Sequence, residues 1–74
     1  MDYAILGSLL KEARIKSGLK QEDVGEKLGV TFQNVSSWER GKSKIDIESL
    51  HTLCKLYEID FNLTLQKSID GDPL

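Results

Sequence analysis

The side chains with the clearest chemical potential gather between positions 20 and 44. Hydroxyl and amide side chains fill most of positions 31–37 (TFQNVSS), and lysine or arginine stands at positions 20, 40, 42 and 44. Amides can pair with base edges in the major groove of DNA, whereas lysine and arginine bind its phosphates. This segment is therefore a candidate for contact with double-stranded DNA.

The distribution of charge favours the same segment. The 74-residue chain carries a formal net charge of −2, which is unusual for a nucleic-acid-binding protein. However, residues 11–44 hold eight Lys or Arg against five Asp or Glu, whereas residues 45–74 hold two against six. The more basic of these two parts is where we expect DNA to bind.

Catalytic chemistry has few candidate residues. The single histidine, His51, and the single cysteine, Cys54, are three residues apart, and side chains at that spacing can touch on a helix. Cys54 falls on an apolar stripe, so we expect a buried, inert thiol. Glu22, Asp23 and Glu26 fall at the start of a predicted helix, where acids stabilise the helix dipole. We therefore predict no enzyme, no metal site and no cofactor.

The composition also limits the compartment and the number of domains. One cysteine permits no intrachain disulfide, and no apolar run approaches the roughly 18 residues of a membrane span. The first residues lack the basic head and the cleavage site of a signal peptide. We expect a cytoplasmic protein with one DNA-binding domain, residues 1–66, followed by a disordered tail, residues 67–74.

Apolar residues recur at helical spacing in four segments, which we predict to be helices: residues 4–17, 21–28, 32–40 and 47–57. Thr31 and Asp46 stand where N-caps would open the third and fourth helices. Gly18, Gly29 and Gly41 follow the first three segments and can adopt the left-handed conformation that ends a helix. Three residues separate the second helix from the third. This arrangement is typical of a unit whose second helix fits the major groove, which is about 12 Å wide.

The segment GLKQEDVGEKLGVTFQNVSSWERGKSK resembles the helix-turn-helix of the phage repressor, Cro and Xre family, and the resemblance covers residues 6–59. Gln21, Gly25 and Gly29 match the glutamine that opens the family's second helix, the small residue inside that helix and the glycine of the turn. The resemblance implies a mostly α, lambda-repressor-like bundle. Ile45 departs from the family, which commonly has a proline at that position.

The resemblance also implies which residues contact DNA. Gln21, at a helix N-terminus, would bind a phosphate. Gln33 would pair with adenine, and Phe32 would either press on thymine methyls or pack against Val30. The complete predicted set of DNA-contacting residues is Lys20, Gln21, Thr31, Phe32, Gln33, Asn34, Ser36, Ser37, Arg40, Lys42 and Lys44.

Two further pairs of residues take their roles from the resemblance. Lys42 and Lys44 lie in a loop that the family lays on the phosphate backbone, where they would add salt-dependent affinity. Arg14 and Glu39 occupy positions where the family often joins its first helix to the end of its third by a partly buried ion pair. The role of that ion pair is structural.

The pattern of residues changes near the C-terminus. Apolar and polar residues alternate over residues 59–66 (IDFNLTLQ), which is a strand signature. A lone strand leaves its backbone groups unpaired, so the predicted partner is the same strand of a second copy, paired antiparallel. The alternative is a poorly amphipathic fifth helix that begins at Asp60. The predicted dimerisation residues are Leu56, Phe61, Asn62, Leu63, Thr64 and Leu65.

The ending LYEIDFNLTLQK resembles HipB-type antitoxins, in which this segment pairs between subunits, and that resemblance implies a HipA-like kinase toxin as partner. The predicted fold is four helices plus a short C-terminal β-strand paired across a dimer. The predicted function is a homodimeric repressor that binds a palindromic operator, in one form the antitoxin of a HipBA-like pair. A free-standing phage or Xre-type regulator, a restriction-modification controller protein and an interaction module that does not bind DNA are the alternatives.

Overall fold

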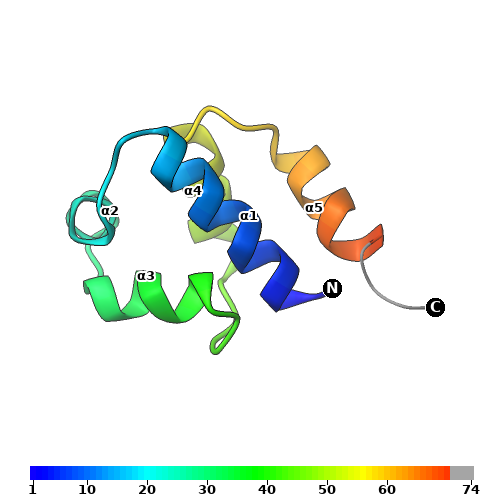
Figure 1. Cartoon of the computed structure of the whole chain (residues 1–74), viewed down its shortest axis with the longest axis horizontal. Helices are drawn as coiled ribbons and strands as arrows, with labels where there is room; N and C mark the ends of the chain where they lie inside the picture. The colour runs from blue at the N-terminus through cyan, green and yellow to red at the C-terminus, as the bar shows by residue number, and fades with distance from the viewer. Residues whose placement is uncertain (71–74) are drawn as a thin grey trace.

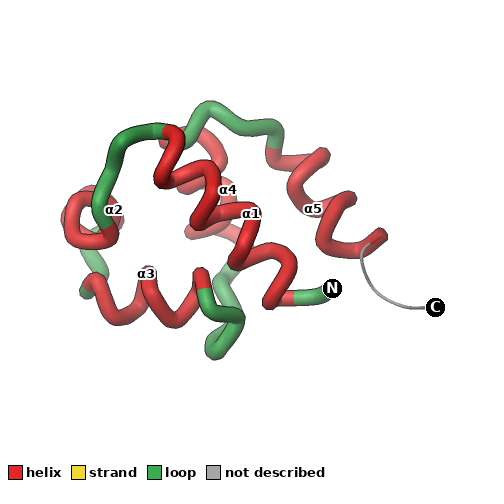
Figure 2. Tube along the Cα trace, in the orientation of Figure 1, coloured by secondary structure: helices red, strands yellow, loops and turns green. Residues whose placement is uncertain are grey.

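Five helices joined by short loops make up residues 1–70, the part of the chain that the computed structural model describes (Figures 1 and 2). They are α1 (Tyr3–Lys16), α2 (Gln21–Leu28), α3 (Phe32–Glu39), α4 (Ile47–Leu56) and α5 (Phe61–Asp70). α2 and α3 lie at one end of the long axis and α5 lies toward the other, with α1 in front of α4 between them (Figure 1). The four predicted helices are confirmed, with ends that differ from the prediction by at most one residue.

Side-chain and glycine caps explain where these helices begin and end. The Asp2 carboxylate accepts hydrogen bonds from the backbone N–H groups of Ala4 and Ile5, at 2.9 and 3.0 Å, and so opens α1. Thr31 and Asp46 cap α3 and α4 with their side-chain oxygens, as predicted. Glycines with positive φ follow α1, α2 and α3 at positions 18, 29 and 41. The local sequence therefore sets most helix boundaries.

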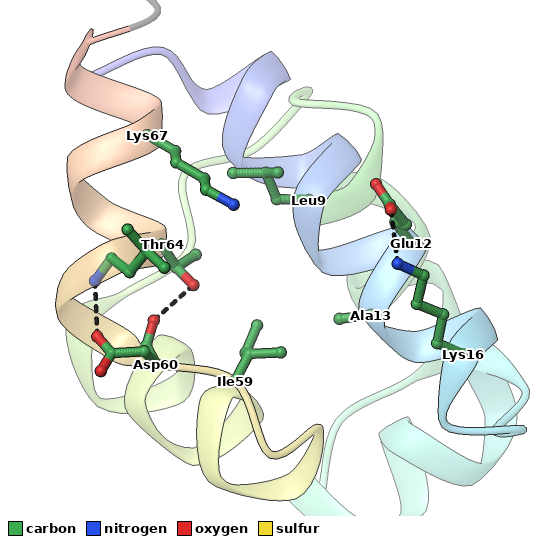
Figure 3. Close-up of a pocket in the computed structure, with 9 residues that line it drawn as sticks. Leu9, Glu12, Ala13, Lys16, Ile59, Asp60, Thr64 and Lys67 are labelled. Carbon is green, nitrogen blue, oxygen red and sulfur yellow. Dashed lines mark hydrogen bonds and ion pairs between the residues drawn. The ribbon is translucent and has the colours of Figure 1, made fainter.

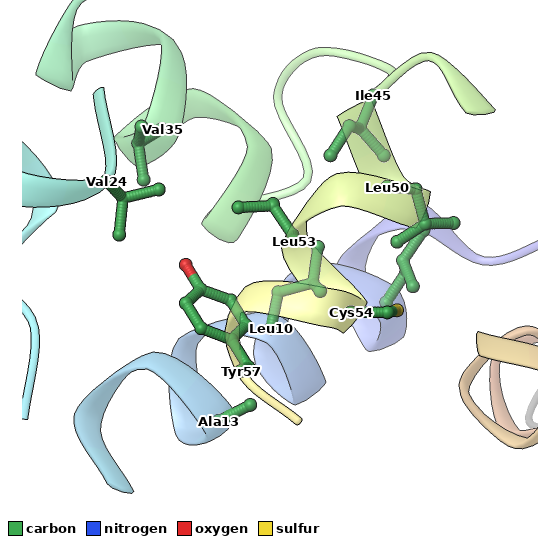
Figure 4. Packing of buried hydrophobic residues seen from close by; sticks show 10 residues of the cluster. Leu10, Ala13, Val24, Val35, Ile45, Leu50, Leu53, Cys54 and Tyr57 are labelled. Atoms are coloured by element: carbon green, nitrogen blue, oxygen red, sulfur yellow. The ribbon is translucent and has the colours of Figure 1, made fainter. Parts of the chain in front are cut away.

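The core forms where α1, α3 and α4 meet, with α2 closing one side (Figure 4). The side chain of Cys54 is almost completely buried in it, and burial raises the pKa of the thiol, which disfavours the reactive thiolate. The hydroxyl of Tyr57 points toward Val24 and Val35, and burial raises its pKa as well (Figure 4). The aliphatic side chains that are almost completely buried are Leu6, Leu10, Val24, Val35, Leu50 and Leu53.

Two glycines allow α3 and the turn before it to pack very closely against α1 and α2. A Cβ atom on Gly7 of α1 would lie 2.4 Å from the carbonyl oxygen of Trp38 and 2.6 Å from that of Glu39, at the end of α3. A Cβ atom on Gly25 of α2 would lie 2.6 Å from the carbonyl oxygen of Val30, in the turn before α3. These are backbone atoms, which cannot rotate away, so only glycine permits the observed placement of α3.

Arg14 of α1 and Glu39 at the end of α3, the pair that the resemblance implied, form a bidentate ion pair. Arg14 Nε and Nη2 lie 2.7 and 3.1 Å from the two carboxylate oxygens of Glu39. Arg14 Nη1 also donates a hydrogen bond to the carbonyl oxygen of Leu19, at 2.9 Å. Both side chains are largely buried, and the hydrogen bond to Glu39 raises the pKa of Arg14. The pair joins α1, α3 and the loop before α2.

The predicted C-terminal strand is wrong, because its residues form α5. Asp60 caps this helix by accepting a hydrogen bond from the backbone N–H of Leu63, at 2.7 Å. Thr64 and Ser68, four residues apart, face inward and are 6% and 0% exposed. Their hydroxyls donate to the backbone carbonyls of Asp60 and Leu65, so both are satisfied inside the helix. The segment is therefore a helix whose small residues face inward four positions apart, in spite of its alternating apolar and polar residues.

This correction changes every prediction that rested on the strand. A fold of five helices replaces the four helices plus strand, and the antiparallel ladder between two copies does not form. Lys67–Asp70, predicted as the start of a disordered tail, belong to α5, and positions 71–74 lie outside the described residues. Leu56 is half-buried against the core of its own chain. The remaining residues assigned to the ladder lie within α5: Phe61, Asn62, Leu63, Thr64 and Leu65.

The beginning of the chain is tied to α5. The backbone N–H of Asp2 donates a hydrogen bond to the carbonyl oxygen of Ser68, at 3.2 Å. The N-terminus and the last turn of α5 consequently lie side by side, at the opposite end of the long axis from α2 (Figure 1).

We predict that Gly7→Ala lowers the free energy of unfolding by about 1–3 kcal/mol, because the added methyl group overlaps the backbone at the end of α3. Urea unfolding followed by circular dichroism measures the change. Ser8→Ala, at the exposed neighbouring position of α1, is the control and should change stability little. A Gly7→Ala variant as stable as Ser8→Ala would show that α3 can move aside at no cost.

We further predict that Arg14→Met lowers the free energy of unfolding by about 3 kcal/mol, because it leaves the Glu39 carboxylate buried without its partner. The double variant Arg14→Met/Glu39→Leu removes that stranded charge and should recover part of the loss. Urea unfolding of Arg14→Met, Glu39→Leu and the double variant measures the coupling energy between the two side chains. Strictly additive losses would mean that the two side chains do not interact energetically.

Candidate nucleic-acid interface

The unit formed by α2 and α3 has a tight, well-defined turn. Gly29 ends α2 in the left-handed conformation, with φ 73°, and the backbone N–H of Val30 donates to the carbonyl oxygen of Gly25 at 2.9 Å. Thr31 then opens α3 by accepting a hydrogen bond from the backbone N–H of Asn34. These interactions fix the angle at which α3 leaves α2, and therefore which side chains of α3 face outward.

The outward face of α3 is polar with one aromatic residue. Gln33 and Asn34 are exposed, and within residues 1–70 their side chains form no hydrogen bond, so both amides are available to a ligand. Ser36 and Ser37 are half-buried on the flanks of this face. Phe32 is 46% exposed, and this exposure favours the surface interpretation over packing in the core. In contrast, Val35 and Glu39 turn inward.

Basic side chains continue from the end of α3 into the loop before α4. Arg40, Lys42 and Lys44 are all exposed. The Nζ atom of Lys44 lies 5.9 Å from the centre of the Tyr3 ring, within the range of a cation–π contact, whereas the side chain of Lys42 has no hydrogen bond or ion pair within the described part of the chain. The loop therefore presents three cations beside the polar face of α3, and no carboxylate pairs with them among residues 1–70.

The remaining predicted contacts lie at the start of α2. Lys20 is exposed, and its backbone N–H donates to Asp23 at 2.8 Å. Gln21 is half-buried, and its Nε2 donates to Glu39 Oε1 at 3.0 Å. The amide nitrogen expected to bind a phosphate is thus used inside the fold, where it ties α2 to the Arg14–Glu39 pair. A phosphate at this helix start would be met by backbone N–H groups instead.

Several contacts that position this surface were not predicted from the sequence. Gly7 was not singled out, although a glycine between Leu6 and Leu10 on the inward side of a helix is a signal of close packing. The contact between Lys44 and Tyr3 joins residues far apart in the sequence, so no local pattern reveals it. The same holds for Gly41, where a Cβ atom would lie 2.8 Å from the Cα of Ala4.

The residues considered for other chemistry lie elsewhere. His51 is exposed on α4, and its ring contacts the ring of Phe61 edge-on, with 5.3 Å between centres. Cys54 is buried on the inward side of α4 and does not share this surface. Residues 1–70 contain no cluster of three or more His, Cys, Asp or Glu that could hold a metal ion. None of the helices described is both long and apolar enough to cross a membrane.

Known proteins resemble this chain in sequence over most of its length. The Helix-turn-helix family (HTH_3) matches residues 10–63. The HTH-type transcriptional regulator ImmR of Bacillus subtilis is 39% identical over 62 residues, which cover 84% of this chain and 49% of ImmR. A transcriptional regulator in the ATPase CF(0) region of Rhodospirillum rubrum is 27% identical over 70 residues, which cover 95% of this chain and 65% of that protein. The chain thus spans about half the length of ImmR.

The fold also matches a solved structure. The crystal structure of the clp gene regulator ClgR from C. glutamicum superposes with a TM-score of 0.82 at 22% sequence identity, covering 100% of this chain and 96% of the ClgR chain. This likeness supports the all-helical fold and the correction of the predicted strand. The family match extends from the middle of α1 into α5 and includes the whole of α2 and α3. This chain therefore belongs to the Xre/Cro-type helix-turn-helix family.

Proposed function

We propose that this chain is a sequence-specific, double-stranded-DNA-binding transcription regulator of the cytoplasm, and that it acts as a dimeric repressor at a palindromic operator. The observation that carries the proposal is the outward face of α3, where the Gln33 and Asn34 amides have no partner among residues 1–70. A helix that leaves its amides unpaired presents the groups that pair with base edges. The transcriptional regulators similar to this chain support the same function.

The shape of α3 suits the major groove. It has eight residues and is therefore about 12 Å long, and it begins directly after the tight turn that ends α2. Gln33 has the side chain best suited to recognise adenine, because its amide oxygen can accept a hydrogen bond from adenine N6–H₂ while its amide NH₂ donates one to N7. Phe32, exposed beside it, can contact thymine methyl groups. Base recognition is therefore assigned to the N-terminal half of α3.

Electrostatics supports phosphate contacts from the adjoining loop. Arg40, Lys42 and Lys44 lie directly after α3, so a phosphate backbone beside the helix would meet them. Of the acidic part of the chain, residues 45–74, only Ile45 and Asp46 lie in this loop, and the Asp46 carboxylate caps α4. The net charge of −2 is therefore compatible with DNA binding, because the local charge next to α3 is positive.

One helix of this length reads only a few base pairs, so high specificity requires a second reading helix. Two identical chains related by a twofold axis supply that helix and read a palindromic site. Bound across a promoter, such a dimer would block transcription. The antitoxin role and the HipA-like partner rested on the C-terminal strand, and they are not part of this proposal because those residues form α5.

We predict that Gln33→Ala weakens binding to the preferred DNA sequence by about 1–3 kcal/mol and changes binding to unrelated DNA little, because it removes a base contact. The preferred sequence is obtained by selecting DNA from a random pool with the wild-type chain, and affinities are measured by fluorescence anisotropy. Asn62→Ala, which removes an exposed amide from α5, is the control and should bind normally. Equal losses on both DNAs would remove Gln33 from the reading surface.

We also predict that Lys42→Ala and Lys44→Ala each weaken binding to all DNA sequences and reduce the salt dependence by about one unit of slope, because each removes one phosphate contact. Binding titrations over a range of salt concentrations measure the slope. Lys55→Ala, an exposed lysine in the last turn of α4, provides the comparison. If neither loop variant changes the slope, the DNA lies on another surface, and a wild-type chain with no salt-dependent binding at all would refute DNA binding.

A further inference from the structure

The first turn of α1 packs against the basic loop that follows α3 (Figure 1). Gly41, at the start of this loop, has a φ of 68°, and a Cβ atom on it would lie 2.8 Å from the Cα atom of Ala4 and 2.9 Å from its backbone nitrogen. The Asp2 carboxylate caps the same turn of α1 by accepting hydrogen bonds from two backbone N–H groups. The loop therefore rests on a helical turn that is itself fixed by a cap.

Interactions on both sides of Lys44 anchor its backbone. Before it, the backbone N–H of Lys42 donates a hydrogen bond to the carbonyl oxygen of Ser37, at 2.9 Å. After it, the side chain of Ile45 is buried in the core, and the Asp46 carboxylate caps α4. These anchors limit the positions from which the side chain of Lys44 can extend.

The Tyr3 ring contacts the side chain of Lys44 without neutralising its charge. The Lys44 Nζ atom lies 5.9 Å from the centre of the ring, and the ring is half-buried and packs against the core. In contrast, Lys16 is held by a carboxylate, with 3.0 Å between its Nζ atom and Glu12 Oε1, so its charge is compensated (Figure 3). An aromatic ring attracts a cation through its quadrupole and carries no net charge. Lys44 thus keeps a full positive charge for a phosphate.

We propose that Tyr3 is a positioning residue for DNA binding, whose ring holds the Lys44 ammonium group where it meets a phosphate of the DNA backbone beside α3. Tyr3 acts through Lys44 and does not itself contact DNA. A lysine side chain loses rotamer freedom when it binds a phosphate, and a side chain already held by a ring has lost part of that freedom before DNA arrives. This inference rests on the proposed function, because it concerns one of the phosphate contacts assigned there.

Lys42 provides an internal comparison in the same loop. It is exposed, and its side chain has no hydrogen bond, ion pair or ring contact within residues 1–70. Its contribution to DNA binding should therefore not depend on the residue at position 3. Two lysines of one loop, of which one rests on an aromatic ring, allow the effect of the ring to be measured separately from the effect of charge.

The first test compares two substitutions of Tyr3 by fluorescence anisotropy, on the selected DNA and on unrelated DNA. Tyr3→Leu removes the ring and should weaken binding to both DNAs by about 2- to 5-fold for each bound chain, the size expected of a cation–π contact at an exposed site. Tyr3→Phe keeps the ring and should bind as the wild type does. A Tyr3→Leu variant that binds as tightly as the wild type or more tightly would overturn the proposal. Equal losses in Tyr3→Phe would assign the effect to the hydroxyl and would overturn it as well.

The second test distinguishes positioning of Lys44 from a general effect on the fold. Tyr3→Leu should lower the affinity by the same 2- to 5-fold in a Lys42→Ala background, and should cause no further loss in a Lys44→Ala background. If Tyr3 only stabilises the chain, the loss will be equal in the wild-type, Lys42→Ala and Lys44→Ala backgrounds. That result would overturn the proposal, including in the case where Tyr3→Leu folds less completely than the wild type.

Nuclear magnetic resonance observes the contact in the absence of DNA. The ring current of Tyr3 should shift the ε-methylene protons of Lys44 upfield, whereas those of Lys42 should remain near the ordinary value for lysine. The shift should persist in Tyr3→Phe and disappear in Tyr3→Leu. Indistinguishable ε-methylene shifts for Lys44 and Lys42 in the wild type would show that the ring does not hold the Lys44 side chain.

The effects of Lys44→Ala and Gln33→Ala separate a failure of this inference from a failure of the proposed function. If Gln33→Ala weakens binding to the selected DNA while Lys44→Ala has no effect, the proposed function stands and the role of Tyr3 is refuted. If the wild type binds neither the selected nor the unrelated DNA, the proposed function is refuted, and with it any role of Tyr3 in DNA binding. A loss in Lys44→Ala that Tyr3→Leu reproduces in part, without adding to it, supports both.

Discussion

The close contact between the backbone of α3 and the glycines on either side of it is the constraint on which the rest of the structure depends. Gly7 of α1 and Gly25 of α2 each occupy a position where a Cβ atom would overlap backbone carbonyl oxygens. The helix is consequently placed by main-chain contacts at both ends, in addition to the contacts that its side chains make. Such a placement allows α3 to present a constant surface even though the chain has only a small core.

The buried ion pair between Arg14 and Glu39 has a related role. The cost of desolvating the two charges offsets much of their attraction, so the ion pair adds little net stability. Its bidentate geometry nevertheless fixes the rotation of α3 relative to α1. Gln21 extends this network to α2 through its hydrogen bond to Glu39. A single carboxylate therefore connects both helices of the helix-turn-helix unit to α1, which explains why a glutamine at the start of α2 is engaged within the fold.

The sequence predicts the structure well where local interactions decide it. Caps such as Thr31 and Asp46 and the left-handed Gly29 can be recognised from neighbouring residues, and the outward position of Gln33 follows from them. α5 could not be predicted in this way, because the alternation of its residues favours a strand, and only the burial of Thr64 and Ser68 in the folded chain shows the helical spacing. The contacts that orient the site, including Gly7 with α3 and Lys44 with Tyr3, join distant parts of the chain and have no local signature.

The hydrogen bond between Asp2 and Ser68 has an architectural consequence. It brings the N-terminus and the end of α5 together, at the opposite end of the long axis from α2 (Figure 1). An additional domain fused after α5 would therefore leave from the end opposite α2, whereas one fused before α1 would start beside the basic loop that follows α3, where Lys44 contacts Tyr3. Additional length beyond α5 can thus be accommodated in this fold without rebuilding the surface of α3.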